Sequence, residues 1–463
     1  MTSNTPSRQT EPPKDMLDVE DALDQILSLV DVMPPETKPI ADTFGQVLAE
    51  DLVAPFDIPP HDNTAMDGYA VQAADTTPAG FSFGALAEQD GQATDDQTVR
   101  LKVVGELAAG YLYDGRLGPG EAIRIMTGAP MPEGADAVVP FEETDEEGHL
   151  AGGESQTRRA PGQEQPDEFP SVGIRKAAKV GANIRPRGED VRSGQTILFK
   201  GAVMRGAEIA VAASMGIDQV QVIRRPLIAI LSTGDELLVP GRPPEPGKIY
   251  DSNSYGLTAQ VLEYGGVPQP QGIAQDTVEA LTAKVHQALY HADLLVTSAG
   301  VSRGDFDVVK EVLVNEGQVH FWTVKMKPGK PLAFGKFDGP DDRQVPHIGL
   351  PGNPVSSLLA FELFGRPAIH KMLGRQPQPR PMLRAITDDA IHNSDGRRIY
   401  ARVTVAQEDD GRWHAQLTGK QSSGILTSMV YANAFAICPD DVDEVPAGAE
   451  VDVLMVDWDH PAE

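Results

Sequence analysis

Three turns rich in small residues follow apolar runs in the second half of the chain, and each could bind an anion. They are S-T-G-D-E at 232–236, S-A-G-V-S at 298–302 and P-G-N-P-V-S at 351–356. Small residues leave backbone N–H groups accessible, and the third turn opens a predicted helix whose N-terminus favours negative charge. One such turn is also a common connector, but three on neighbouring strands predict a phosphate-bearing ligand. The candidate binding residues are Thr233, Asp235, Ser298, Gly300, Ser302, Asn353 and Ser356.

A cluster of lysines in K-M-K-P-G-K-P could supply positive charge to the same ligand. Its members are Lys325, Lys327 and Lys330. The alternative is a solvated charge run on an edge strand. We favour the binding interpretation because two prolines and a glycine stiffen the loop and the chain otherwise avoids positive charge. No G-x-x-x-x-G-K-[ST] motif occurs, so nucleotide hydrolysis by a P-loop is not indicated.

Carboxylates also recur near the predicted strand ends. Hard oxygen ligands of this kind suit Mg²⁺, which commonly takes one or two carboxylates together with substrate phosphates. The alternative is that surface turns favour Asp, and for Asp305 we accept it. Ten histidines without metal-type spacing and a single cysteine make a structural zinc site improbable. The acidic residues in question are Asp235, Glu236, Asp276, Asp305 and Asp307.

The elements that must position these residues alternate between apolar runs and helical periodicity. This alternation predicts a mostly parallel, doubly wound α/β sheet, and ligands of such sheets bind where the strands end. Strands are predicted within 226–238, 292–305, 319–335 and the start of 345–364, and helices at 253–266, at 277–292 and after the P-G-N-P turn.

The flanking segments predict other structures. Apolar positions from Asp15 to Val30, beginning with Met16, recur at helical spacing, with Asp15 or Asp18 as a cap. Short apolar runs between Gly and Pro clusters at 72–142 predict a small β domain, and a helix at 206–215 is predicted to end at Gly216. Residues 1–14 are predicted to be disordered, 143–171 to be a mobile loop, and the chain after 375 to be a β-barrel-like module.

Composition limits the class of protein. With 463 residues, two to four domains are expected. A net charge of −29 disfavours nucleic acid and anionic membranes as partners. The single Cys438 excludes an intrachain disulfide, and neither a signal segment nor a membrane-spanning apolar run is found. A cytoplasmic protein is therefore predicted.

Seven strings in order make the chain resemble the molybdopterin molybdenumtransferase family, the MoeA-type proteins related to the C-terminal part of gephyrin. The resemblance covers nearly the whole chain from about residue 15. The strings are DNTAMDGYA (62–70), IRIMTGAPMPEGADAVV (123–139), RPRGEDV (185–191), STGDEL (232–237), SAGVSRGDFD (298–307), MKPGKP (326–331) and LPGNPVS (350–356).

The resemblance implies a multidomain α/β plus β fold and a homodimer, with the active site in a cleft to which both subunits contribute. It also allows a separate molybdopterin adenylyltransferase and molybdoenzyme acceptors as partners. The implied domains are an elongated helical domain (15–53 and 190–224), an inserted β domain (54–189), a molybdopterin-binding α/β domain (225–374) and a C-terminal β-barrel (375–463).

Site residues are implied by position in the family's motifs. The family has a second lysine at the position where this chain has Thr323. We hypothesise that Lys325 supplies the missing positive charge, because a strand places residues 323 and 325 on the same face. The matching residues are Asp67, Thr127, Asp190, Glu236, Asp276, Asp307, Lys327, Arg402 and Ser423.

The implied reaction takes molybdate and adenylylated molybdopterin, releases AMP and leaves molybdenum on the dithiolene. Arg402, Ser423 and Lys327 are the candidates for binding molybdate, and Asp276 and Asp307 for binding Mg²⁺. Two alternatives stay open. One is a molybdopterin adenylyltransferase, which uses the same α/β domain, and the other is a non-catalytic scaffold of the gephyrin kind.

Overall fold

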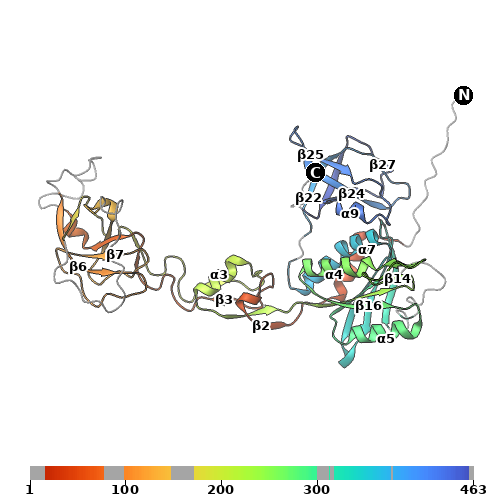
Figure 1. The fold of residues 1–463 in the computed structure, drawn as a ribbon, viewed down its shortest axis with the longest axis horizontal. Coiled ribbons are helices and arrows are strands. Elements are labelled where there is room, and N and C mark those ends of the chain that lie inside the picture. The colour runs from red at the N-terminus through yellow and green to blue at the C-terminus, as the bar shows by residue number, and fades with distance from the viewer. Residues whose placement is uncertain are drawn as a thin grey trace. The chain divides into compact units, whose positions relative to one another are not determined.

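The chain divides into two compact units (Figure 1). The first consists of residues 1–50, 200–210 and 218–463, and the second of residues 51–199 and 211–217. The predicted tail at 1–14 and residues 147–170 of the predicted loop lie outside the described residues. The computed structural model describes residues 16–77, 98–146, 171–299, 312, 317–376 and 379–457.

A seven-stranded sheet of order β1-β18-β20-β21-β17-β13-β16 forms the centre of the first unit. Strands β21, β17, β13 and β16 are parallel, whereas β20 is antiparallel to both β21 and β18. The predicted mostly parallel sheet is thus confirmed, with an antiparallel side added. In sheet order the strands are Met16–Leu17, Gly317–Val324, Pro331–Asp338, Gln344–Leu350, Leu294–Ser298, Leu227–Thr233 and Val267–Ala274.

Pairing register brings the key loops to one edge of this sheet. Parallel strands β13, β17 and β21 all end there. Ala333 near the start of β20 pairs with Gly349 near the end of β21, and Thr323 near the end of β18 pairs with Pro331. The lysine loop between β18 and β20 therefore lies at the same edge as the three predicted turns.

Side chains on β13 alternate between two hydrophobic cores, as a strand with helices on both faces requires. Ile228 and Ile230 pack with Leu257 of α4 in the first core, and Ala229 and Leu231 pack with Val285 of α5 in the second. Figure 1 shows α4 and α5 on opposite faces of the sheet. The first face is covered by α1 (Val19–Leu29), α4 (Ser252–Tyr264), α7 (Pro354–Ala360), the π-helix η6 (Phe361–Gly365) and α8 (Arg366–Met372), and the second by α5 (Val278–Leu289).

Helix ends follow local capping chemistry at α4 and α5 but not at α1. Asp251 accepts the Ser254 N–H at 3.1 Å at the start of α4, and Thr277 accepts the Ala280 N–H at 3.3 Å at the start of α5. The prediction that α1 includes Met16 is wrong, because Met16 pairs with Thr323 in β1. Asp18 occupies the N-cap position without a side-chain hydrogen bond, and Asp15 lies outside the described residues.

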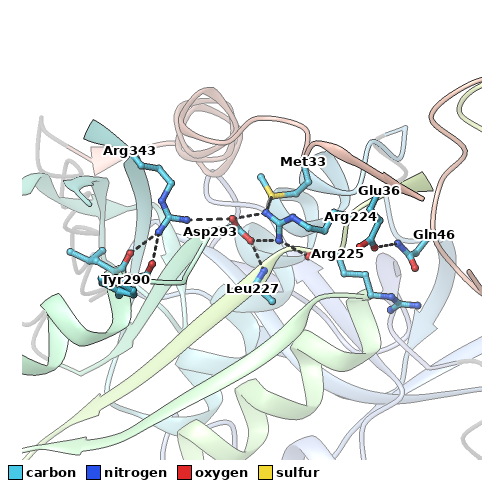
Figure 2. Close-up of polar contacts among 10 residues, drawn as sticks. Met33, Glu36, Gln46, Arg224, Arg225, Leu227, Tyr290, Asp293 and Arg343 are labelled. Atoms are coloured by element: carbon cyan, nitrogen blue, oxygen red, sulfur yellow. Dashed lines mark hydrogen bonds and ion pairs between the residues drawn. The ribbon is translucent and has the colours of Figure 1, made fainter. Parts of the chain in front are cut away.

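A polar cluster fixes the opposite edge of the sheet, where the chain enters β13 (Figure 2). Asp293, just before β17, accepts hydrogen bonds from both terminal nitrogens of Arg224 at 2.9 Å and from the Leu227 N–H at 2.7 Å. Arg224 follows β12 (Gln219–Ile223), which pairs antiparallel with β2 (Pro35–Pro39). Strands β14 (Leu237–Leu238) and β15 (Ile249–Tyr250) form a short parallel pair in the same unit.

The predicted C-terminal barrel is confirmed as a closed one. Strand β24 pairs with both β25 and β26, so the order β24-β25-β22-β28-β26 returns to its start. Strand β19 (Met326–Lys327) of the lysine loop adds in parallel to β24. The barrel comprises β22 (Met382–Thr387), β24 (Arg398–Gln407), β25 (Trp413–Leu417), β26 (Ala434–Cys438) and β28 (Glu450–Met455), with β23 (Ile391–His392), β27 (Glu444–Val445) and helix α9 (Thr427–Val430) as additions.

The second unit contains a five-stranded sheet of order β8-β5-β7-β6-β9 with a hydrophobic core on each face. Helix α3 (Gly206–Ser214) is followed by Gly216 at φ 69°, as predicted. No helix among the described residues is both long and apolar enough to span a bilayer. The sheet strands are Ala137–Pro140, Gly68–Val71, Glu121–Ile125, Val99–Leu107 and Ser171–Ile174, and the short pairs are Leu52–Val53 with Thr196–Leu198 and Asn63–Thr64 with Ile184–Arg185.

Candidate functional site

A cavity of about 430 Å³ opens where β13, β17 and β21 end. All three predicted turns contribute side chains to its wall, and Pro331 at the start of β20 completes the wall on the side of the lysine loop. The structure therefore brings the turns together as their strand-end positions predicted. The predicted residues that line the cavity are Thr233, Glu236, Ser298, Asn353 and Ser356.

Asn253 at the start of α4 joins two of these turns, and the sequence analysis missed it. Its Nδ2 donates to the Ser298 hydroxyl at 2.6 Å and to the Gly352 carbonyl at 2.8 Å. Only 9% of Asn253 is exposed, and it lines the cavity. Asp251 and Tyr250 also line the cavity and were missed. The D-S-N-S string at 251–254 signals a helix cap, but nothing local in it signals contact with a distant turn.

Two predicted carboxylates lie side by side next to the cavity. The Asp235 N–H donates to the Asp276 carboxylate at 3.3 Å, and the Asp276 N–H donates to the Asp235 carboxylate at 3.2 Å. Lys248 donates to the backbone carbonyl of Asp235. Both carboxylates are exposed, so their oxygens remain available to a hard cation.

The rest of the predicted cation site lies outside the described residues, as do other residues of the second turn. Within the described ranges, one group of three possible metal ligands gathers, but it lies on the barrel, at the exposed Asp388 and Glu408 and the partly buried His414. The predicted residues outside the described ranges are Gly300, Ser302, Asp305 and Asp307.

The helix after the P-G-N-P turn offers fewer free N–H groups than predicted. Pro354 has no N–H, and the Val355 N–H donates to the Ser423 carbonyl at 3.3 Å. Of the first three helical positions, Ser356 is left with an N–H that the helix does not use. The hydrogen bond from Val355 also places Ser423, from a barrel loop, beside the cavity wall.

Two of the three predicted lysines are paired with carboxylates. The ammonium of Lys325 lies 2.9 Å from Asp440 and 3.6 Å from Asp18, and Asp440 raises the pKa of Lys325. Lys327 is 41% exposed and lies 3.5 Å from Asp395. Lys330 has no ion pair with any residue in the described part of the chain. An anion at the cavity would thus compete with acidic groups for Lys325 and Lys327, whereas no described acidic residue competes for Lys330.

Arg402 on β24 is buried and hydrogen-bonded to the barrel loop. Its Nε donates to the Ser428 hydroxyl at 3.0 Å, and its terminal nitrogens donate to the carbonyls of Gln421 and Ser422 at 3.2 Å. Burial lowers the pKa of Arg402 to about 10, which leaves it charged at neutral pH. Arg402 is 1% exposed, and its guanidinium holds the loop that carries Ser423.

The predicted residues of the second unit include one joined pair. Asp67 accepts both the backbone N–H of Thr127 at 2.6 Å and its hydroxyl at 2.7 Å, and these bonds lower the pKa of Asp67. Asp190 is also exposed, and its N–H donates to the Ile58 carbonyl at 3.0 Å. No contact within the described residues joins Asp190 to Asp67 or Thr127.

Three family models together match most of the chain. One for the MoeA N-terminal region (domain I and II) matches residues 17–216, one for a probable molybdopterin binding domain matches 229–371, and one for the MoeA C-terminal region (domain IV) matches 384–456.

Curated relatives and solved structures also match along most of the chain. A molybdopterin molybdenumtransferase 2 of Mycobacterium tuberculosis is 36% identical, covering 92% of this chain and 95% of the relative. A molybdopterin molybdenumtransferase of Nostoc sp. is 34% identical, covering 89% and 86%. A crystal structure titled as a molybdopterin biosynthesis MoeA protein from a Pyrococcus species covers 95% of this chain and 99% of its own, with 31% identity and a TM-score of 0.74.

Proposed function

The chain belongs to the MoeA family, and on that premise we propose that it is a molybdopterin molybdenumtransferase, a molybdenum insertase of molybdenum cofactor biosynthesis. The observation that carries the proposal is the cavity at the sheet edge, where three polar turns meet. Hydroxyl and amide donors surround a volume suited to a phosphorylated pterin. The single cysteine is consistent with work in the cytoplasm.

In the proposed reaction, adenylylated molybdopterin and molybdate are the substrates and AMP is released. Thr233, Ser298, Asn353 and Ser356 line the cavity and would bind the pterin phosphate or the phosphoanhydride, together with Gly300 and Ser302. Lys330 would add positive charge to this group. Molybdate would bind to Lys325 and Lys327, together with Arg402 and Ser423.

The donor set beside the cavity fits Mg²⁺. Asp276 and Asp235 present exposed carboxylates that share only long hydrogen bonds, of 3.3 and 3.2 Å, with each other's backbone. In the proposal Asp276 and Asp307 hold the ion, which would neutralise negative charge as the phosphoanhydride is cleaved. Glu236 lines the cavity next to Asp235 and would orient the attacking group.

The proposal includes a homodimer in which Asp67 and Thr127 of one protomer serve the cavity of the other, with Asp190 as a further site residue. The support lies in the exposed Asp67–Thr127 pair, a carboxylate held ionised by two hydrogen bonds with solvent beside it. A group held in this way can position a substrate hydroxyl or a water molecule.

Two rival functions are less well supported. A molybdopterin adenylyltransferase uses the α/β domain alone, whereas this chain also matches the N-terminal and C-terminal regions of MoeA proteins. A non-catalytic scaffold would not need the reciprocal Asp235–Asp276 contact beside the cavity.

Asp276→Ala tests the proposal most directly. We expect AMP release from adenylylated molybdopterin to fall at least a hundredfold while the pterin still binds. Asp409→Ala, an exposed turn residue of the barrel, is the matched control and should turn over normally. Undiminished AMP release by Asp276→Ala would remove the metal assignment, and adenylylated pterin accumulating from Mg-ATP without molybdenum uptake would favour the adenylyltransferase.

A further inference from the structure

We propose that Asn253 is a positioning residue that fixes the Ser298 hydroxyl as a hydrogen-bond donor to the phosphate of the pterin substrate. The inference rests on the proposed function for the identity of the ligand. It assigns a role to Asn253, a residue at the start of α4 that belongs to none of the three predicted turns.

The orientation of the Asn253 amide follows from its two partners. The Gly352 carbonyl can only accept a hydrogen bond, so the amide atom 2.8 Å away must be Nδ2. The second hydrogen of Nδ2 then points to the Ser298 oxygen at 2.6 Å. Ser298 therefore accepts from Asn253 and cannot donate to it.

The Ser298 hydroxyl keeps its own hydrogen for another acceptor. No hydrogen bond donated by this hydroxyl occurs within the described residues, and Ser298 lines the cavity. A hydroxyl that already accepts a hydrogen bond is a better donor, because bonds in a chain polarise one another. Phosphate oxygens are strong acceptors, so an anionic ligand in the cavity would satisfy this hydrogen.

The amide oxygen is the second polar atom of Asn253, a residue of the cavity wall. Its Oδ1 is buried and accepts no hydrogen bond from the described part of the chain. Buried acceptors without partners are uncommon because they cost stability. An N–H group of the bound pterin is the kind of donor that would pair with this oxygen.

The test compares Asn253→Asp, Ser298→Ala and the double variant in the full-length protein. A carboxylate at 253 keeps an acceptor oxygen but cannot donate, so Ser298 would turn its hydrogen toward Asp and away from the ligand. The readout is the dissociation constant of molybdopterin and of its dephosphorylated form. We expect each single variant to weaken binding of the phosphorylated form about tenfold or more and to leave the dephosphorylated form within about threefold.

Non-additivity separates this role from simple charge repulsion. If Asn253 acts through Ser298, the double variant should bind no more weakly than Asn253→Asp alone. Asn353→Asp is the matched control, because it adds the same charge to the cavity wall without touching Ser298. In a variant that combines Asn353→Asp with Ser298→Ala, the two fold-increases in the dissociation constant should multiply. If Asn253→Asp does not fold, Asn253→Ala replaces it. Alanine removes both the donor and the acceptor of the amide, so with this variant the non-additivity with Ser298→Ala is the only readout.

Multiplicative effects of Asn253→Asp and Ser298→Ala, or equal losses for both forms of the pterin, would overturn the inference. If the wild-type protein does not bind molybdopterin, the proposed function fails instead. The same cycle is then measured with inorganic phosphate as the probe. Non-additive effects on phosphate binding would support the positioning role of Asn253, and additive effects would contradict it.

Discussion

At the scale of one residue, Arg402, which we propose as a molybdate ligand, also serves the structure of the barrel. Its guanidinium is buried, and in the described part of the chain its partners are backbone carbonyls and the Ser428 hydroxyl. Arg402→Met would leave these acceptors without donors. We expect the free energy of unfolding to fall by about 3 kcal/mol, measured by urea denaturation.

Arg402→Lys separates the two roles of this residue. An ammonium can reach some of the same carbonyls, so the loss of stability should be smaller than in Arg402→Met. Molybdate affinity should fall in parallel with stability if the arginine acts by holding the loop of Ser423. A variant of unchanged stability that no longer binds molybdate would instead indicate direct contact with the oxyanion.

The Asp67–Thr127 pair leads to a second prediction. Thr127→Val removes the hydroxyl donor and keeps the backbone N–H, so the pKa of Asp67 should rise while staying below its ordinary value. Titration of the Asp67 carboxyl by NMR measures this shift. Thr127→Ser retains a hydroxyl and should keep the wild-type pKa. An unshifted pKa in Thr127→Val would mean that the side-chain bond contributes nothing.

The site could be predicted from the sequence only where a residue acts through its own turn. Thr233 and Ser298 end strands β13 and β17, and Ser356 lies in the helix after β21. Their position at the strand ends alone predicted that they would meet. Asn253 depends on an amide that reaches two loops about 45 and 99 residues later in the chain, which no local pattern encodes. The Val355 N–H was predicted to be free because its partner, the Ser423 carbonyl, comes from another domain.

At the scale of elements, Asp293 controls how β12 leads into β13 (Figure 2). Its side chain is 8% exposed and accepts three hydrogen bonds from Arg224 and Leu227, and Arg343 lies 3.8 Å away. Asp293→Asn removes the charge that the Arg224 guanidinium contacts directly and leaves Glu36 as a more distant counter-charge. We expect a loss of about 3 to 5 kcal/mol in the free energy of unfolding.

The control for Asp293 is an ion pair of similar length at the surface. Glu263 is 56% exposed and pairs with Arg380 at 3.0 Å. Glu263→Gln should cost less than about 1 kcal/mol, because solvent screens exposed pairs. Equal losses in the two variants, measured by urea denaturation, would show that burial does not strengthen the Asp293 cluster.

The order of elements was easier to predict than their edges. Periodicity identified α4, α5 and the parallel strands because each buries a continuous apolar face. It failed at Met16, whose helical spacing suits α1 but whose backbone adds to the sheet beside Thr323. The two-residue edge strand β1 forms only because it pairs with β18, some 300 residues later in the chain. The antiparallel pairing of β18 with β20 likewise depends on tertiary structure.

At the scale of the whole molecule, the net charge of −29 bears on how stability depends on pH. Between pH 7 and about 5 most carboxylates stay ionised, so their mutual repulsion changes little. Histidines titrate in this interval, and among those in the described ranges His347 is buried and His370 is partly buried. Burial lowers the pKa of His347 to about 3, and burial with nearby Arg375 lowers that of His370 to about 4.

Both histidines therefore predict a loss of stability on mild acidification. An unfolded histidine has a pKa of about 6.5, so below that pH the unfolded chain binds protons that the folded protein excludes. The free energy of unfolding should fall by up to about 2.7 kcal/mol per pH unit between pH 6 and 5, or about 1.4 kcal/mol for each histidine. His414 acts in the opposite direction, because its hydrogen bond with Asp388 raises its pKa.

His347→Leu measures the contribution of one of these groups. The ring lies between Thr297, 2.9 Å from Nε2, and Phe337, so a leucine leaves the Thr297 hydroxyl without its partner and lowers stability at every pH. The slope is the informative quantity, because the variant has one buried histidine fewer to protonate on unfolding. Urea denaturation at pH 7, 6 and 5 should give about half the wild-type slope. An unchanged slope would mean that His347 is already protonated in the folded protein or that other groups dominate the pH dependence.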